Sequence, residues 1–286
     1  MSTSVKYKTH TSDLGVRRLL RDELPSDPNA VEVQDLLLLG TSLGGARPKT
    51  VIEDQGELWI AKFARPDDRW NYERVEHAMF ELARRCGITT ADSRIETVAG
   101  KDVLLVKRFD RYEGYTRSRM ISGLTVLRAD DSVSNGDRWS YILFAEQMRR
   151  VVDQPKRNLR ELFRRIVFNA LISNLDDHPS NHALIAPARR WSLSPAYDLT
   201  PAPQIGQDHR DPAMVCGDRG RFANALNILS EHARFLLERA DAEKIITDMT
   251  EQVAGTWYDT VRECGVSVQD AETIRSAFVY PGFSLE

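Results

Sequence analysis

Apolar positions follow two regular patterns along the chain, and these patterns divide it into a strand-rich first part and a helix-rich remainder. Five short segments have the apolar runs or alternation typical of strands: residues 33–39, 50–52, 57–63, 93–98 and 102–109. The tripeptides Asp54-Gln55-Gly56 and Ala99-Gly100-Lys101 separate two pairs of these segments. Turn residues at these places predict two β-hairpins.

Helical spacing appears first at residues 71–86, where Gly87 follows as a natural C-terminal stop. The same spacing returns at 141–152 and strongly at 158–174, where Asn158 and Glu161 resemble a capping box. Residues 222–286 are mostly helical in pattern, with Ser267 and Asp270 suited to cap a last helix. Residues 112–137 are poorly patterned and predict a long loop with one short element. We therefore expect an α+β fold with a lobe boundary near residue 110, giving lobes 1–110 and 111–286.

Composition narrows the class of protein. The 286 residues include 42% hydrophobic and 28% charged positions, enough for one substantial core or two modest lobes. The net charge of −3 gives no global attraction to nucleic acid or anionic membrane, so we expect neither as a direct partner. No apolar run approaches the roughly 20 residues of a membrane span, and no signal-peptide core is visible. Three widely spaced cysteines without a CxxC pattern suit a reducing compartment, and we expect a cytoplasmic protein.

The polar loop after the 158–174 helix carries the strongest chemical signal. Asp176 is followed five positions later by Asn181, and Asp198 stands at the end of a short apolar strand at 191–194. Kinases use such residues to accept the proton of a hydroxyl and to hold magnesium against a nucleotide. A surface turn is the alternative. His178 and His182 are four positions apart, but Pro179 interrupts a helical face and oxygen ligands dominate, so we do not expect them to bind a metal.

A glycine-containing turn at residues 40–49 precedes the second predicted strand and ends in Lys49. Its glycines, Gly44 and Gly45 among them, would let backbone N–H groups approach a phosphate, although an ordinary hairpin with exposed basic residues has the same pattern. Lys62 lies inside an apolar strand, where an ammonium needs an anionic partner. Glu76 borders the apolar stripe of the 71–86 helix and could face Lys62. For both side chains, plain exposure to solvent remains an alternative.

Five motifs together, in this order, resemble the HipA-type serine/threonine kinases, which are toxins of bacterial toxin–antitoxin systems. They are GTSLGGARPK at 40–49, AKF at 61–63, KRFDR at 107–111, NLDDHPSN at 174–181 and LSPAYDLTP at 193–201. The resemblance implies a two-lobed protein-kinase-like fold that uses ATP and Mg²⁺. It implies the following roles: Asp176 as catalytic base, Asn181 and Asp198 as magnesium ligands, Lys62 as the nucleotide lysine, Lys107 and Phe109 as backbone contacts of adenine, and Asp110 near the ribose.

In that family a serine at the start of the glycine loop is autophosphorylated, which ejects the loop and inactivates the kinase, and Ser42 matches it. Family substrates include aminoacyl-tRNA synthetases, and the partner is an antitoxin that we expect to bind DNA. The chain is shorter than the full-length toxins and is expected to lack most of the N-terminal subdomain. Two other functions remain open: a small-molecule kinase on the same scaffold, and a nucleotide-binding regulator with little turnover.

Overall fold

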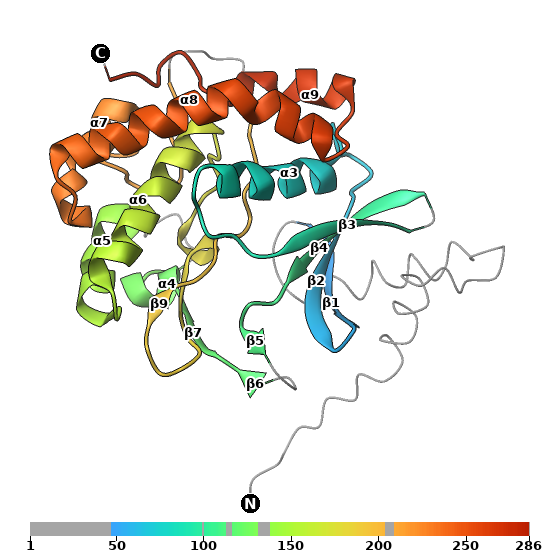
Figure 1. The fold of residues 1–286 in the computed structure, drawn as a ribbon, viewed down its shortest axis with the longest axis horizontal. Helices are drawn as coiled ribbons and strands as arrows, with labels where there is room; N and C mark the ends of the chain where they lie inside the picture. Colours follow the sequence, from blue (N-terminus) through green and yellow to red (C-terminus); the bar gives the residue numbers. More distant parts are fainter. Residues whose placement is uncertain (1–46, 99, 113–115, 131–137, 204–208, 286) are drawn as a thin grey trace, which may run out of the picture.

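The computed structural model describes residues 47–98, 100–112, 116–130, 138–203 and 209–285 (Figure 1). The predicted strand at 33–39 and the residues Ser42, Gly44 and Gly45 lie outside the described residues. Within the described part, a β-sheet forms the earlier segment and helices dominate the later one (Figure 1). The predicted α+β fold is therefore confirmed, whereas the lobe boundary near residue 110 stays a prediction.

The first sheet is antiparallel and has the strand order β1-β2-β4-β3. Its strands match the predicted segments: β1 (Lys49–Asp54), β2 (Glu57–Phe63), β3 (Ser93–Val98) and β4 (Lys101–Lys107). Successive side chains of β4 point to opposite faces of the sheet. Val103 and Leu105 pack in a small apolar cluster with Trp59, whereas Leu104 and Val106 pack in the main core. The sheet is consequently buried on both faces along β4.

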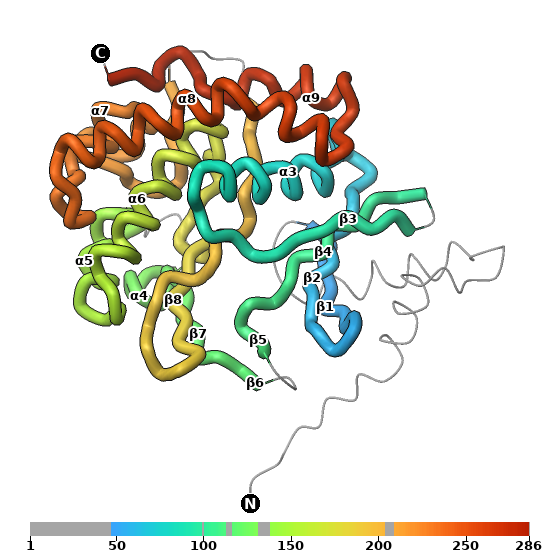
Figure 2. The backbone as a smooth tube through the Cα atoms, in the orientation of Figure 1, coloured from blue at the N-terminus to red at the C-terminus, as the bar shows by residue number. Residues whose placement is uncertain are grey.

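Helix α3 (Tyr72–Arg85) packs between this sheet and the later helices. It begins after Asn71, whose side chain accepts a hydrogen bond from the Arg74 N–H at 2.9 Å. The helix packs against β3 and β4 on one side and against the long helix α8 (Arg239–Glu263) on the other, as Figure 2 shows. The main apolar core runs without a break from β4 through α3 into the later helices.

The later part is built around α6 (Pro155–Leu171), which packs against α5 (Tyr141–Val151), α7 (Ala225–Ser230) and α8. Helix α6 starts three residues earlier than predicted, with a proline in its first turn, so the predicted capping box is wrong. The side-chain oxygen of Asn158 accepts a hydrogen bond from the Leu193 N–H at 2.7 Å instead. The last helix, α9 (Val268–Ile274), is capped by Ser267 as predicted and continues into η5 (Arg275–Ala277).

The segment expected to be a long loop with one short element contains more than one such element in its described residues. It contains β5 (Arg111–Tyr112), β6 (Thr116–Arg117), β7 (Arg119–Ser122) and α4 (Gly123–Leu127). Strand β7 pairs with β8 (Ala183–Ala186), which also pairs with β9 (Ser192–Leu193). The prediction of a single short element missed β7 because this strand gains its hydrogen bonds from β8, more than sixty residues away, and the local pattern does not encode that pairing. No helix within the described residues is long and apolar enough to cross a membrane.

Candidate active site

Lys62 occupies the centre of the candidate site. Its Nζ lies 2.6 Å from Oε1 of Glu76 on α3 and 2.7 Å from Oδ1 of Asp198. Burial alone would lower the pKa of this ammonium, but the two carboxylates outweigh burial and raise it. Lys62 is therefore held in its charged form. The structure brings together these three predicted residues from β2, α3 and the segment after β9.

Asp198 has a backbone conformation that few non-glycine residues adopt, with φ at +60°. The positive charge of Lys62 keeps the pKa of Asp198 below its ordinary value, and the charges of Lys49 and His178 act in the same direction. Burial raises the pKa of Glu76 even though Lys62 is adjacent. One carboxylate oxygen of Asp198 faces Lys62, and no described residue bonds the other. That second oxygen is available to a cation.

The segment before Asp198 is fixed from two sides. The Ala91 N–H donates to the Ala196 carbonyl at 2.9 Å, and the Ala196 N–H donates to the Thr89 carbonyl at 2.8 Å. Arg165 of α6, which is only 2% exposed, donates through Nη2 to the Ser194 carbonyl at 2.6 Å. Glu161 accepts from the same guanidinium at 3.1 Å and from the Thr89 N–H at 3.0 Å.

From the sequence, Arg160, Arg164 and Arg165 are expected to form a solvated face of this helix rather than a nucleic-acid patch, and the burial of Arg165 shows that this expectation is wrong for Arg165. One signal in the sequence was the Glu161 carboxylate four positions before Arg165, at a spacing that lets the two side chains pair. The helix that carries them has a broad apolar stripe. Sequence reasoning missed that the pair points inward toward the strand that leads to Asp198.

The catalytic-loop candidates lie between α6 and β8. Asp176 is exposed, and no described side chain or backbone group bonds its carboxylate. Asn181, in the turn η3 (Pro179–Asn181), is 7% exposed and donates through Nδ2 to the Asp176 carbonyl at 3.3 Å. With Nδ2 used in this way, the side-chain oxygen of Asn181 is left for another ligand. The hydroxyl of Tyr197 donates to the Ser180 carbonyl at 2.8 Å, which ties this loop to the residue next to Asp198.

Asp177 anchors the loop from beneath. It is 1% exposed, and its Oδ2 accepts hydrogen bonds from the Tyr141 hydroxyl and from Nδ2 of Asn169, the latter at 2.7 Å. Nε2 of His182 lies 2.8 Å from the same oxygen. Among the described residues, no group of three or more His, Cys, Asp and Glu side chains could hold a metal by itself. Sequence reasoning did not single out Asp177, because an Asp-Asp pair does not reveal which carboxylate points inward.

The predicted hinge lies at the end of β4. The N–H of Lys107 donates to the Asp92 carbonyl at 2.8 Å, and its side chain pairs with Glu57. Within the described residues, no acceptor bonds the N–H of Phe109, whose ring lies 5.6 Å from that of Tyr197. Asp110 is paired with Arg108 at 2.8 Å and with Arg111. The carbonyl of Lys107 and the N–H of Phe109 have no hydrogen-bond partner among the described residues, so both are open to a ligand.

Comparison with known proteins identifies the family. The model of the HipA-like C-terminal domain matches residues 41–257. The chain belongs to this family. One relative, named "Putative kinase Y4dM" in Sinorhizobium fredii, is 27% identical over 242 residues, which are 78% of this chain and 57% of the relative. A "Putative kinase" of Haemophilus influenzae is 25% identical over 207 residues, 64% of this chain and 60% of the relative. The chain thus spans somewhat more than half the length of these relatives.

Two solved structures share the fold of this HipA-like chain. One is HipA of Shewanella oneidensis MR-1, in the complex of its toxin–antitoxin system with HipB and operator DNA. It has a TM-score of 0.65 and 16% identity, with 93% of this chain and 68% of that chain covered. The other is the Helicobacter pylori proinflammatory kinase CtkA, with a TM-score of 0.52 and 14% identity. The match covers 78% of this chain and 93% of that chain. At these identities the likeness establishes the α+β fold.

Proposed function

We propose that this HipA-like chain is an ATP- and magnesium-dependent serine/threonine protein kinase that acts as the toxin of a bacterial type II toxin–antitoxin system. The observation that carries the proposal is the position of Lys62 between Glu76 and Asp198. A buried lysine paired with a helix glutamate is the device by which kinases present a cation to nucleotide phosphates. In this chain the same lysine also contacts the candidate magnesium ligand.

The metal would be held by Asn181 and Asp198. Each offers an oxygen that no described residue uses, and amide and carboxylate oxygens are the ligands that Mg²⁺ prefers. Two protein ligands suffice because Mg²⁺ usually completes its shell with water and substrate phosphates. When bound, the ion would neutralise the charge that develops on the transferred phosphoryl group. Lys62, which contacts Asp198, and Lys49 would bind the phosphates beside the metal ligands.

Asp176 would serve as the catalytic base. Its carboxylate is exposed, so a hydroxyl of a protein substrate can approach it. The Asn181 amide holds the Asp176 carbonyl, and Asp177 fixes the loop below, so the base stands on a rigid support. Adenine would bind to the carbonyl of Lys107 and the N–H of Phe109, with Asp110 beside the ribose. The family resemblance supports these last assignments.

The proposed regulation and partners of this chain rest on the same family resemblance. Phosphorylation of Ser42 would add roughly two negative charges to a loop that has to cradle phosphates, which would weaken nucleotide binding. Substrates of the aminoacyl-tRNA synthetase class, and an antitoxin that binds DNA, are proposed here by similarity to the HipA-type toxins. Intact-mass analysis of wild type and Ser42→Ala after incubation with ATP tests the modification. A phosphate added to both proteins alike would contradict the assignment to Ser42.

Transfer of labelled phosphate from ATP tests the activity itself. The purified chain, Asp176→Asn and the control Asp259→Asn, an exposed aspartate on α8, are each incubated with a lysate. We expect labelled protein with wild type and the control, and at least a roughly hundredfold loss with Asp176→Asn. Absence of transfer to any protein would refute the protein-kinase proposal.

The remaining outcomes identify the alternative functions. Transfer to a metabolite alone would indicate a small-molecule kinase. Normal growth of cells that express the chain would indicate a nucleotide-binding regulator, provided that Asp198→Asn has the same effect on DNA binding as wild type. Phosphoproteomic comparison of cells that express wild type or Asp176→Asn would then identify the substrate.

A further inference from the structure

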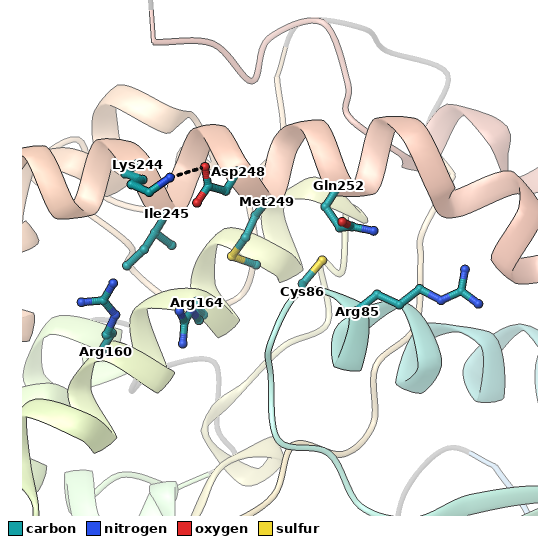
Figure 3. A pocket seen from close by; sticks show the side chains of 9 residues that line it. All are labelled: Arg85, Cys86, Arg160, Arg164, Lys244, Ile245, Asp248, Met249 and Gln252. Atoms are coloured by element: carbon teal, nitrogen blue, oxygen red, sulfur yellow. Dashed lines mark hydrogen bonds and ion pairs between the residues drawn. The ribbon is translucent and has the colours of Figure 1, made fainter.

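A cavity of about 170 Å³ lies between α3, α6 and α8, lined by residues outside the candidate active site. Figure 3 shows how its side chains are arranged: Arg160 and Arg164 extend from α6, while Ile245 and Met249 point from α8 toward them. Cys86, at the end of α3, closes one side. The floor is therefore apolar and buried, since Ile245 and Met249 are each 4% exposed.

Two positively charged side chains at this cavity have no acidic partner among the described residues. Lys244 is paired with Asp248 at 3.0 Å, and Arg85 donates to Thr260 at 2.8 Å and pairs with Glu263. Arg160 and Arg164 are half-buried, and no acidic side chain of the described residues pairs with either. Glu161, the carboxylate nearest in sequence, is already bonded to Arg165 and to the Thr89 N–H.

This arrangement costs stability unless something else supplies negative charge. Arg160 and Arg164 are four residues apart on one helix, a spacing at which like charges repel. The guanidinium of arginine presents paired N–H donors that match the geometry of a carboxylate or a phosphate. Two guanidinium groups above an apolar floor can each donate paired hydrogen bonds to the oxygens of one tetrahedral anion. The missing charge is therefore best supplied by a ligand.

We propose that this cavity is a binding site for a phosphate-bearing small molecule, held by Arg160 and Arg164. The volume is below the roughly 300–1,000 Å³ of pockets that enclose whole drug-sized ligands, so the site suits one or two phosphate groups with little attached to them. Lys244 lies at the edge of the cavity and can turn from Asp248 toward the anion. The proposal stands independently of the proposed kinase activity, because none of these residues belongs to the candidate active site.

Calorimetric titration of inorganic pyrophosphate into the full chain tests the site. The double variant Arg160→Gln/Arg164→Gln should bind at least about tenfold more weakly, because each charge-assisted pair contributes strongly to such affinities. Arg157→Gln, an exposed arginine in the first turn of the same helix, is the matched control and should bind as wild type does. Lys62→Ala removes a phosphate-binding cation of the candidate active site, so the pyrophosphate binding that remains in this variant is assigned to the cavity.

Three results would overturn the proposal. The first is unchanged pyrophosphate affinity in the folded double variant, with folding checked by circular dichroism. The second is an equal loss in Arg157→Gln, which would indicate only nonspecific attraction to a basic helix. The third is a double variant that loses affinity for a DNA duplex but not for pyrophosphate, which would assign the arginines to a nucleic-acid surface. Hydrogen exchange should locate the ligand by added protection at residues 160–164 and 244–252.

Discussion

The Nζ atom of Lys62 lies 2.7 Å from Oδ1 of Asp198, which is 136 residues further along the chain. This contact joins a strand of the first sheet directly to the segment that follows β9. The ammonium has three donors, of which Glu76 and Asp198 accept two, so one is left for the phosphate of a nucleotide. The pair is thus both a structural link and part of the candidate phosphate site.

Replacement of Lys62 by methionine should destabilise the protein by about 3 kcal/mol, because it leaves Glu76 buried without a counter-charge. The further change Glu76→Gln should recover much of that loss, since a neutral amide is less costly to bury. Urea unfolding of wild type, both single variants and the double variant measures the coupling. Strictly additive changes in the free energy of unfolding would mean that the two side chains do not interact.

Asp176 and Asp177 are neighbours with opposite expected roles. Asp177→Ala removes the acceptor shared by Tyr141, Asn169 and His182 and should cost about 3–5 kcal/mol of stability. Asp176→Ala removes an exposed carboxylate that no described residue bonds, so the stability should change by no more than about 0.5 kcal/mol. Phosphotransfer should nevertheless be lost in Asp176→Ala. Thermal unfolding and the labelled-ATP assay are run on both variants. A larger loss of stability in Asp176→Ala than in Asp177→Ala would contradict this prediction.

The sequence predicts the parts of the fold that depend on local pattern. Strand β2 and strand β3 occupy the predicted residues, because alternation and turn residues are encoded within a few positions. The expected approach of Glu76 to Lys62 also appears in the structure, whereas the contact between Lys62 and Asp198 was not predicted. Strand β7 and the inward direction of Arg165 were missed, because each depends on partners distant in the sequence. Nothing local distinguishes such residues from a loop or a solvated helix face.

Gly123 packs where a side chain has no room. A Cβ atom there would lie 2.4 Å from the carbonyl oxygen of Pro179, and the Gly123 N–H donates to the His182 carbonyl at 2.7 Å. Gly123→Ala should therefore shift the catalytic loop, lowering stability by about 1–3 kcal/mol and reducing phosphotransfer. Gly255→Ala, in α8 with open space around it, is the control and should raise stability by roughly 0.4–1 kcal/mol. Equal effects of the two changes in urea unfolding would contradict the close-packing argument.

Asp198 should make folding stability sensitive to acid. Lys62 keeps the pKa of Asp198 below its ordinary value, so the folded state binds its proton less readily than the unfolded state. The stabilisation is fully present above the ordinary aspartate pKa of about 4 and is lost as the pH falls through the folded-state pKa. Wild type should thus exceed Asp198→Asn by roughly 1 kcal/mol at pH 7, a modest value because the Asp198 side chain is 41% exposed.

The gap between wild type and Asp198→Asn should stay constant from pH 7 to about pH 5 and shrink below about pH 4. Urea unfolding across this range measures it. Burial raises the pKa of Glu76, which therefore has the opposite dependence and is retained in both proteins. Asp176→Asn is the control for the loss of one carboxylate, because no described residue bonds that side chain. A gap for Asp198→Asn that persists undiminished to pH 3 would show that the contact with Lys62 does not stabilise the ionised carboxylate.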